Sequence, residues 1–227
     1  MQWIYFCRLE LSIAYNKQGK FRMSKRKIPK NYRNITGKIG SNKALHGFVS
    51  FESKLERDFY FLFDYLPQIK TFDDQPLTIE YEFEGKDRSY TPDFLLTLNN
   101  GSHILGEVKY RSELMEKFDE FEHKFSAAIE FSKQKKNWTF RIFTEKCPYL
   151  QNEDLFWNIR YLLDYDYIDP QQYEKIYTAF TPFNRLDELL AKITTDSSEY
   201  LDIVSTLWAL VRHRKIRSEE RRVGKEC

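Results

Sequence analysis

The sequence has few of the cysteines and histidines on which disulfide-bonded and zinc-binding folds depend. Its 227 residues contain three cysteines (Cys7, Cys147 and Cys227) without paired spacing, which indicates a reducing compartment and no disulfide framework. Four scattered histidines form no zinc pattern. No apolar run reaches the roughly 20 residues that a membrane helix needs. These absences predict a cytoplasmic protein with no membrane partner.

Excess charge is also absent, because the formal net charge is only +2. A DNA-binding surface must therefore be a local patch. Residues 25–43 form a basic segment rich in Gly, Asn and Ser, which is either a solvated arm or an arm that contacts phosphates without reading sequence. Its candidate DNA contacts are Lys25, Arg26 and Lys27. Residues 1–21 form a leader that begins with an apolar stretch, Met1 to Cys7, and lacks signal-peptide features. The basic stretch after Met23 predicts that translation starts there.

The chain has enough apolar residues for a core, at 41% hydrophobic and 17% aromatic. Residues 51–66 carry a stripe of Leu and Phe at helical spacing, which predicts a helix ended by Pro67. Ser53 and Glu56 have the spacing of a capping box, in which Glu56 bonds back to the amide of Ser53. This helix alone therefore favours a structural role for Glu56.

A hairpin is predicted in residues 89–109, because two apolar runs flank an Asn-Asn-Gly-Ser turn. Asp93 follows Pro92 in the first run, and the second run ends with Glu107 and Lys109 on one face of its strand. A two-residue loop would place residue 93 opposite residue 108. Grouping Asp93 with Glu107 therefore requires an odd-length loop, a bulge or a bend at Pro92.

Two carboxylates and a lysine on adjacent strands suit a metal-dependent phosphodiesterase. Carboxylate oxygens bind a hard cation such as Mg²⁺, which activates water and neutralises phosphate charge. Lysine can orient that water or meet the developing charge. The alternative is an ordinary pair between Glu107 and Lys109, but charges within such apolar strands are costly unless they are paired or bind metal.

The remaining segments predict a mixed α/β domain followed by a helical one. Residues 69–83 read as extended, 110–135 as a long helical region and 138–144 as a further strand. Arg111, beside the hairpin, is a candidate phosphate contact. Beyond residue 149 only helical patterns follow, which predicts a helical domain over residues 150–216. The charged tail 217–227 has no periodicity and indicates truncation or a non-native junction.

Pro92-Asp93 followed by Glu107-x-Lys109 resembles the PD-(D/E)xK nuclease signature. With the upstream helix and the Gln75-Pro76 strand entry, the series is similar to the TnsA-type endonuclease subunit of heteromeric transposases. This resemblance implies a restriction-endonuclease-like mixed sheet flanked by helices over residues 44–149, after a leader and arm in residues 1–43. It also implies a small, winged-helix-like C-terminal domain, whose expected wing strands the sequence does not show.

The same resemblance implies roles for residues and partners. Glu56 becomes a third ligand, beside Asp93 and Glu107, of Mg²⁺ or a substituting Mn²⁺, with Glu52 as the fallback, and Lys109 completes the catalytic set. The implied activity is cleavage of the 5′ strand at transposon ends in a prokaryotic cytoplasm. The implied partners are an integrase-type (TnsB-like) subunit and an ATPase (TnsC-like) regulator. A stand-alone restriction- or repair-type nuclease and a non-catalytic DNA-binding or scaffolding module are the alternatives.

Overall fold

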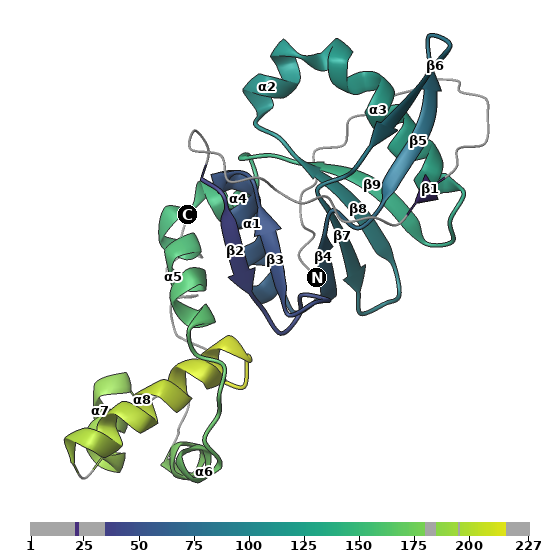
Figure 1. Ribbon diagram of the computed structural model, residues 1–227. Helices are drawn as coiled ribbons and strands as arrows, with labels where there is room; N and C mark the ends of the chain where they lie inside the picture. The colour runs from purple at the N-terminus through teal and green to yellow at the C-terminus, as the bar shows by residue number, and fades with distance from the viewer. Residues whose placement is uncertain (1–20, 23–34, 180–184, 195, 217–227) are drawn as a thin grey trace, which may run out of the picture. The chain divides into compact units, whose positions relative to one another are not determined.

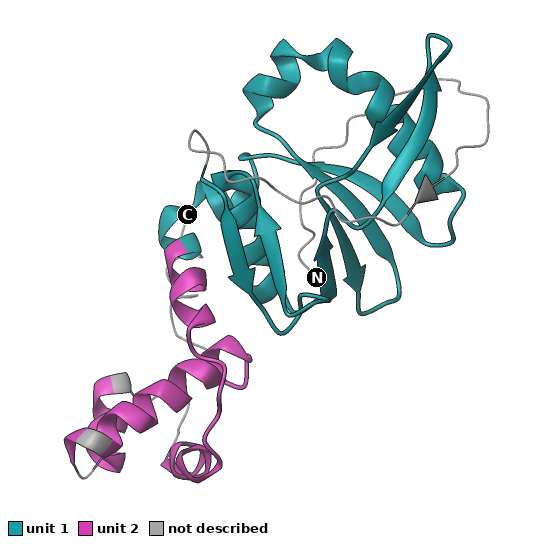
Figure 2. Cartoon of the chain, viewed as in Figure 1, with its two compact units in different colours: residues 1–156 teal, residues 157–227 magenta. Residues whose placement is uncertain are grey.

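The computed structural model describes residues 21–22, 35–179, 185–194 and 196–216 (Figure 1). The candidate DNA contacts Lys25, Arg26 and Lys27 lie outside these residues. The chain forms two compact units, Met1–Phe156 and Trp157–Cys227 (Figure 2).

A four-stranded mixed sheet is the centre of the first unit. Its strands have the order β4-β7-β8-β9, with antiparallel pairing between the first three and parallel pairing between β8 and β9. Helices α1 and α3 pack against it (Figure 1). The strands are β4 (Ile69–Asp74), β7 (Phe94–Leu98), β8 (His103–Val108) and β9 (Trp138–Phe143). This arrangement confirms the predicted restriction-endonuclease-like mixed α/β fold.

Helix α1 (Lys54–Tyr65) forms where the apolar stripe predicted it. The side chain of Ser53 caps its first turn, and the helix ends before Pro67, which cannot continue the hydrogen-bond ladder. The rings of Phe59 and Phe63 pack against Phe143, with centroid distances of 5.3 and 5.8 Å. This aromatic layer fixes α1 to the sheet.

Helix α3 (Phe118–Lys133) follows the shorter α2 (Arg111–Glu116), with a break at Lys117 in what the sequence predicts as one helical region. Its buried residues Phe125 and Ala128 belong to the same apolar cluster as Leu105 of β8. Along β8, alternation puts Leu105 and Glu107 on one face. Glu107 therefore projects toward the side that carries α3.

The extended region predicted over residues 69–83 is divided between two sheets. Gln75, at φ +44°, ends β4, and the chain continues as β5 (Thr78–Phe83) in a sheet of order β1-β5-β6. The segment that joins β6 to β7 also passes from one sheet to the other, and the Gln75 amide donates to the Asp93 carbonyl at 2.9 Å. Asp93 thus lies where the β4–β5 and β6–β7 connections both cross between the two sheets. The other strands here are β1 (Phe21–Arg22) and β6 (Lys86–Tyr90), and β2 (Gly37–Gly40) and β3 (Phe48–Phe51) form a separate hairpin.

The β7–β8 hairpin has a different register from the one that a two-residue loop predicts. Phe94 pairs with Gly106, and the Leu98 amide donates to the Ser102 carbonyl at 2.8 Å, so the loop holds three residues. Gly101 adopts φ +78°, the left-handed conformation that ends such three-residue loops. The odd loop length places Asp93 opposite Glu107, so the pairing of residue 93 with residue 108 was wrong. The odd-length loop that grouping Asp93 with Glu107 requires is present.

Gly106 is needed because the Phe94 ring lies over its backbone. A Cβ at this position would lie 2.1 Å from Phe94 Cζ, and Phe94 is 1% exposed. We therefore expect Gly106→Ala to lower the free energy of unfolding by about 3 kcal/mol through overpacking. Gly40→Ala is the matched control, since its nearest contact would be 3.9 Å away. Urea unfolding of the two variants measures the difference, and equal midpoints would contradict the close approach.

The remaining helices follow the predicted C-terminal pattern. Their bounds are α4 (Pro148–Gln151), α5 (Glu153–Leu163), α6 (Pro170–Ala179), α7 (Leu186–Ile193) and α8 (Ser197–Arg212). In the second unit, α6, α7 and α8 share a core that includes Ile176, Leu189 and Ile203. Within residues 157–179, 185–194 and 196–216 the structure has helices and no wing strand. None of the described helices is long and apolar enough to cross a membrane.

Candidate active site

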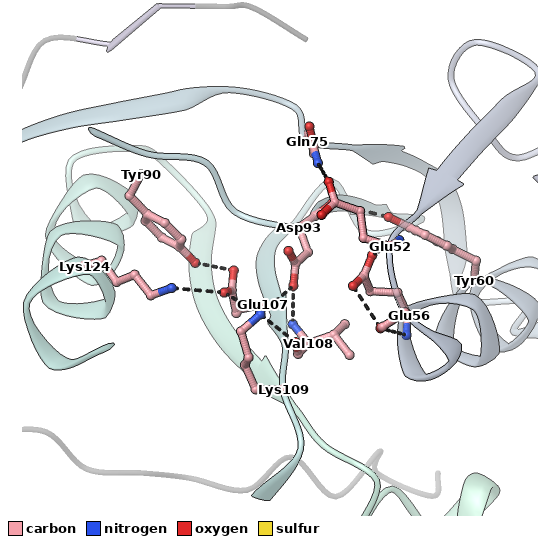
Figure 3. A network of polar contacts seen from close by, with 11 residues as sticks. Glu52, Glu56, Tyr60, Gln75, Tyr90, Asp93, Glu107, Val108, Lys109 and Lys124 are labelled. Atoms are coloured by element: carbon pink, nitrogen blue, oxygen red, sulfur yellow. Dashed lines mark hydrogen bonds and ion pairs between the residues drawn. The ribbon is translucent and has the colours of Figure 1, made fainter. Parts of the chain in front are cut away.

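Three of the predicted site residues converge at the junction of the two sheets (Figure 3). The Lys109 ammonium lies 3.1 Å from Glu107 Oε1 and 3.9 Å from Asp93 Oδ2. The sheet register and the bend at the Asp93 backbone produce this grouping. The structure therefore brings Asp93, Glu107 and Lys109 together around one positive charge.

Glu107 is the most enclosed of the three, with 2% exposure. The Tyr90 hydroxyl donates to its Oε2 at 2.6 Å, while Lys109 and Lys124 lie 3.1 and 3.5 Å from its Oε1. Burial and the neighbouring Glu107 charge raise the Tyr90 pKa well above its ordinary value, so the phenol keeps its proton. A buried carboxylate needs such partners, since an unpaired one would be strongly destabilising.

Lys124 is a site residue that the sequence interpretation missed. It comes from α3, a region that the sequence predicts only as helical, with no site role for its lysines. Its position three residues after Phe121 and one before Phe125, at the edge of the buried stripe, was the available signal. The Lys124 side chain is only 22% exposed and faces the active site (Figure 3).

Asp93 is held by the backbone of the adjacent strand. The Val108 amide donates to its Oδ2 at 2.7 Å, and the Tyr60 hydroxyl donates to its backbone carbonyl at 3.3 Å. Burial raises the Asp93 pKa well above its ordinary value, the Glu107 charge raises it further, and Lys109 opposes both. The charged form of Asp93 is thus disfavoured mainly by burial, and Lys109 offsets that effect only in part.

Lys109 remains a cation despite its surroundings. Burial lowers its pKa, but Asp93 and then Glu107 outweigh that effect, so the net pKa lies above its ordinary value. Its ammonium also donates to the Val108 carbonyl at 3.1 Å. A fixed ammonium between two carboxylates is suited to meeting negative charge on a substrate.

Glu56 occupies a helix cap in this structure. Its Oε1 accepts from the Ser53 hydroxyl and its Oε2 from the Glu52 amide, both at 2.9 Å. The amide is one residue earlier than the capping-box pattern predicted. Glu52, the fallback ligand, accepts a hydrogen bond from Gln75 Nε2 at 3.2 Å. The metal-binding role of Glu56 therefore stays a prediction.

The donor set decides whether a divalent cation fits. Within the described residues, no group of three His, Cys, Asp or Glu side chains is arranged to hold a metal ion. Two carboxylates do face a common cation, the Lys109 ammonium. Mg²⁺ is commonly bound by one or two carboxylates together with water and substrate phosphates. Asp93 and Glu107 fit that requirement.

Arg111 lies at the start of α2, next to the site residues in sequence. Its side chain is exposed, and its backbone amide donates to Glu145 Oε2 at 2.9 Å. A contact with DNA phosphate stays a prediction for Arg111, as it does for Lys25, Arg26 and Lys27.

The raised Asp93 pKa predicts a pH-dependent stability in chelator-treated protein. Protonation of Asp93 removes a buried charge and so stabilises the folded protein. This contribution to the free energy of unfolding is complete at low pH and is lost as the pH rises through the folded-state pKa. Asp93→Asn lacks that titration. We therefore compare the melting temperature of Asp93→Asn with that of the wild type at each pH. The advantage of the variant should be about 3 °C larger at pH 8 than at pH 5, which is the shift that roughly 1 kcal/mol produces. Calorimetry at both pH values measures it, and an equal difference at both would contradict the prediction. Asp87→Asn, on exposed β6, is the control.

A protein-family model matches the part of the chain that contains most of the candidate site. Residues 66–145 match the family model described as TnsA-like endonuclease N terminal. The matched segment includes Asp93, Glu107, Lys109 and Lys124, while Glu56 precedes it. No curated protein matches the chain.

Proposed function

Because residues 66–145 match the model of the TnsA-like endonuclease N-terminal domain, we propose that the chain is the Mg²⁺-dependent DNA endonuclease subunit of a transposase. The proposed reaction is hydrolysis of one phosphodiester in the 5′ strand at each transposon end. The observation that carries the proposal is the grouping of two carboxylates and one lysine, with Lys109 within 3.9 Å of both Asp93 and Glu107. A purely structural module has no need of that combination.

Each residue has a distinct task in this proposal. Asp93 and Glu107 would hold Mg²⁺, or Mn²⁺ in its place. When bound, the ion lowers the pKa of water and neutralises phosphate charge. Lys109 donates toward the phosphoryl oxygens as negative charge develops. The Val108 amide fixes Asp93, and Tyr90 fixes Glu107, so both carboxylates are oriented before substrate arrives.

The proposed partners are DNA carrying the transposon ends, an integrase-type (TnsB-like) subunit that acts at the 3′ ends, and an ATPase (TnsC-like) regulator. A subunit of this kind needs control from its partners, because unrestrained cleavage would cut DNA at random. The predicted basic segment around Lys25, Arg26 and Lys27 and the exposed Arg111 would supply sequence-independent phosphate contacts. The partners, rather than this chain, would then select the ends.

Strand-specific cleavage tests the proposal. The chain is incubated with end-labelled DNA carrying the transposon ends, with and without the two partners, in Mg²⁺ or in chelator. We expect 5′-strand nicks that need Mg²⁺ and increase at least about 100-fold with the partners. Vigorous cutting of plain DNA by the chain alone would favour a stand-alone nuclease. DNA binding without any cleavage in the complete complex would favour a scaffold module.

A further inference from the structure

Lys124 combines aromatic contacts around its ammonium with an ion pair to Glu107. Its Nζ lies 4.4 Å from the Phe121 ring centroid, 5.2 Å from that of Tyr90 and 5.4 Å from that of Phe125. Cation–π contacts of this kind hold an ammonium in place at a partly desolvated site. The ammonium is thereby held 3.5 Å from Glu107 Oε1.

Both carboxylate oxygens of Glu107 already have partners in this arrangement. Two ammonium groups share its Oε1, and the Tyr90 hydroxyl occupies its Oε2. A Mg²⁺ ion would need an oxygen at about 2.1 Å, which brings two positive charges close to both ammonium groups. Coulomb repulsion at such short distances is strong within a protein. One lysine must therefore move away before Glu107 can bind the ion.

The contacts indicate which lysine moves. Lys109 pairs with Asp93 as well as Glu107 and donates to the Val108 carbonyl. The ion pair of Lys124 is with Glu107 alone among the carboxylates of the described residues. Its side chain also comes from a helix rather than from the sheet, so it can withdraw without disturbing the strand register.

We propose that Lys124 is a positioning residue that holds Glu107 in the metal-free protein and gives it up to the incoming divalent cation. Lys124 thereby sets the Mg²⁺ concentration at which the site fills. The inference rests on the proposed function and adds a regulatory role at the same site. As a consequence, Lys124 occupies Glu107 in the metal-free protein until Mg²⁺ displaces it.

Direct metal binding tests the proposal without DNA or cleavage. Calorimetric titration of the full chain with Mg²⁺ compares the wild type with Lys124→Met, which keeps the chain length and removes the charge. We expect the Kd to fall about tenfold, which corresponds to 1.4 kcal/mol. Lys124→Arg, which keeps the charge, should restore a Kd within about threefold of the wild type, a difference below 1 kcal/mol.

Lys133→Met is the matched control, because Lys133 lies on the same helix, is 65% exposed and pairs with Glu130. Its Kd should equal that of the wild type. Thermal unfolding gives a second readout: Lys124→Met should melt lower than the wild type in chelator and recover in saturating Mg²⁺. If Lys124→Met does not fold, Lys124→Gln takes its place in both measurements, with the same expected direction.

The outcomes separate this inference from the proposed function. Mg²⁺ binding that Asp93→Asn abolishes, with the same Kd in the wild type and Lys124→Met, would overturn the role of Lys124 and leave the metal site standing. Equal and negligible binding in the wild type and Asp93→Asn would overturn the metal site itself. A higher Kd for Mg²⁺ in Lys124→Met than in the wild type would show that Lys124 favours binding of the ion rather than competing with it. That result would also contradict the proposal.

Discussion

Asp93→Asn is expected to lower Mg²⁺-dependent DNA cleavage roughly 10³-fold, the scale of losses when a central catalytic group is removed. Asparagine cannot supply the negative charge that would hold the ion. Its carbonyl can still accept the hydrogen bond that the Val108 amide gives to Asp93 Oδ2. The substitution also removes a buried charge whose pKa is raised by burial and by Glu107. Activity should therefore disappear from a protein that is no less stable than the wild type.

The measurement is the single-turnover cleavage rate in the reconstituted complex, beside the urea midpoint of the isolated chain. Asp87→Asn is the control, because Asp87 lies exposed on β6, close in sequence and outside the site. That variant should cleave at the wild-type rate. An unchanged rate in Asp93→Asn would remove the catalytic assignment. A collapse of the urea midpoint would show instead that Asp93 has a mainly structural role.

The sequence predicted the main elements well because most of their determinants are local. The apolar stripe of α1, the apolar runs of β7 and β8 and the breaks at Pro67 and Gly101 are all readable from neighbouring residues. The register of the hairpin was not readable in the same way. Asn100-Gly101 fits a two-residue loop, whereas the structure places Gly101 at the end of a three-residue loop. A difference of one residue decides which side chain faces Asp93.

Long-range contacts explain what the sequence left open at the site. Lys124 meets Glu107 only because α3 packs across the face of β8, and no spacing along the chain encodes that crossing. The division of residues 69–83 between two sheets likewise coincides with a long-range hydrogen bond, from the Gln75 amide to the Asp93 carbonyl. Glu56 illustrates the opposite case, since its cap depends on Ser53 and Glu52 nearby, and the local pattern predicted it correctly apart from the amide involved.

Lys109→Met is expected to reduce cleavage by a similar factor of roughly 10³, for a different reason. Methionine retains the length of the side chain and removes the charge that would stabilise the phosphate as negative charge develops. Because Lys109 lies 3.1 Å from Glu107 Oε1 and 3.9 Å from Asp93 Oδ2, its removal leaves both carboxylates in place with one less competing cation. Mg²⁺ should consequently bind Lys109→Met at least as tightly as it binds the wild type.

This combination separates the functions of the two charged groups. Asp93→Asn should lose both Mg²⁺ binding and cleavage, whereas Lys109→Met should lose cleavage and keep Mg²⁺ binding. Calorimetric titration and single-turnover cleavage on the same protein preparations measure both properties. Lys86→Met, on the exposed β6 strand, is the control and should change neither. If Lys109→Met lost Mg²⁺ binding together with cleavage, Lys109 would be organising the carboxylates, and the charge that meets the phosphate would have to come from another residue.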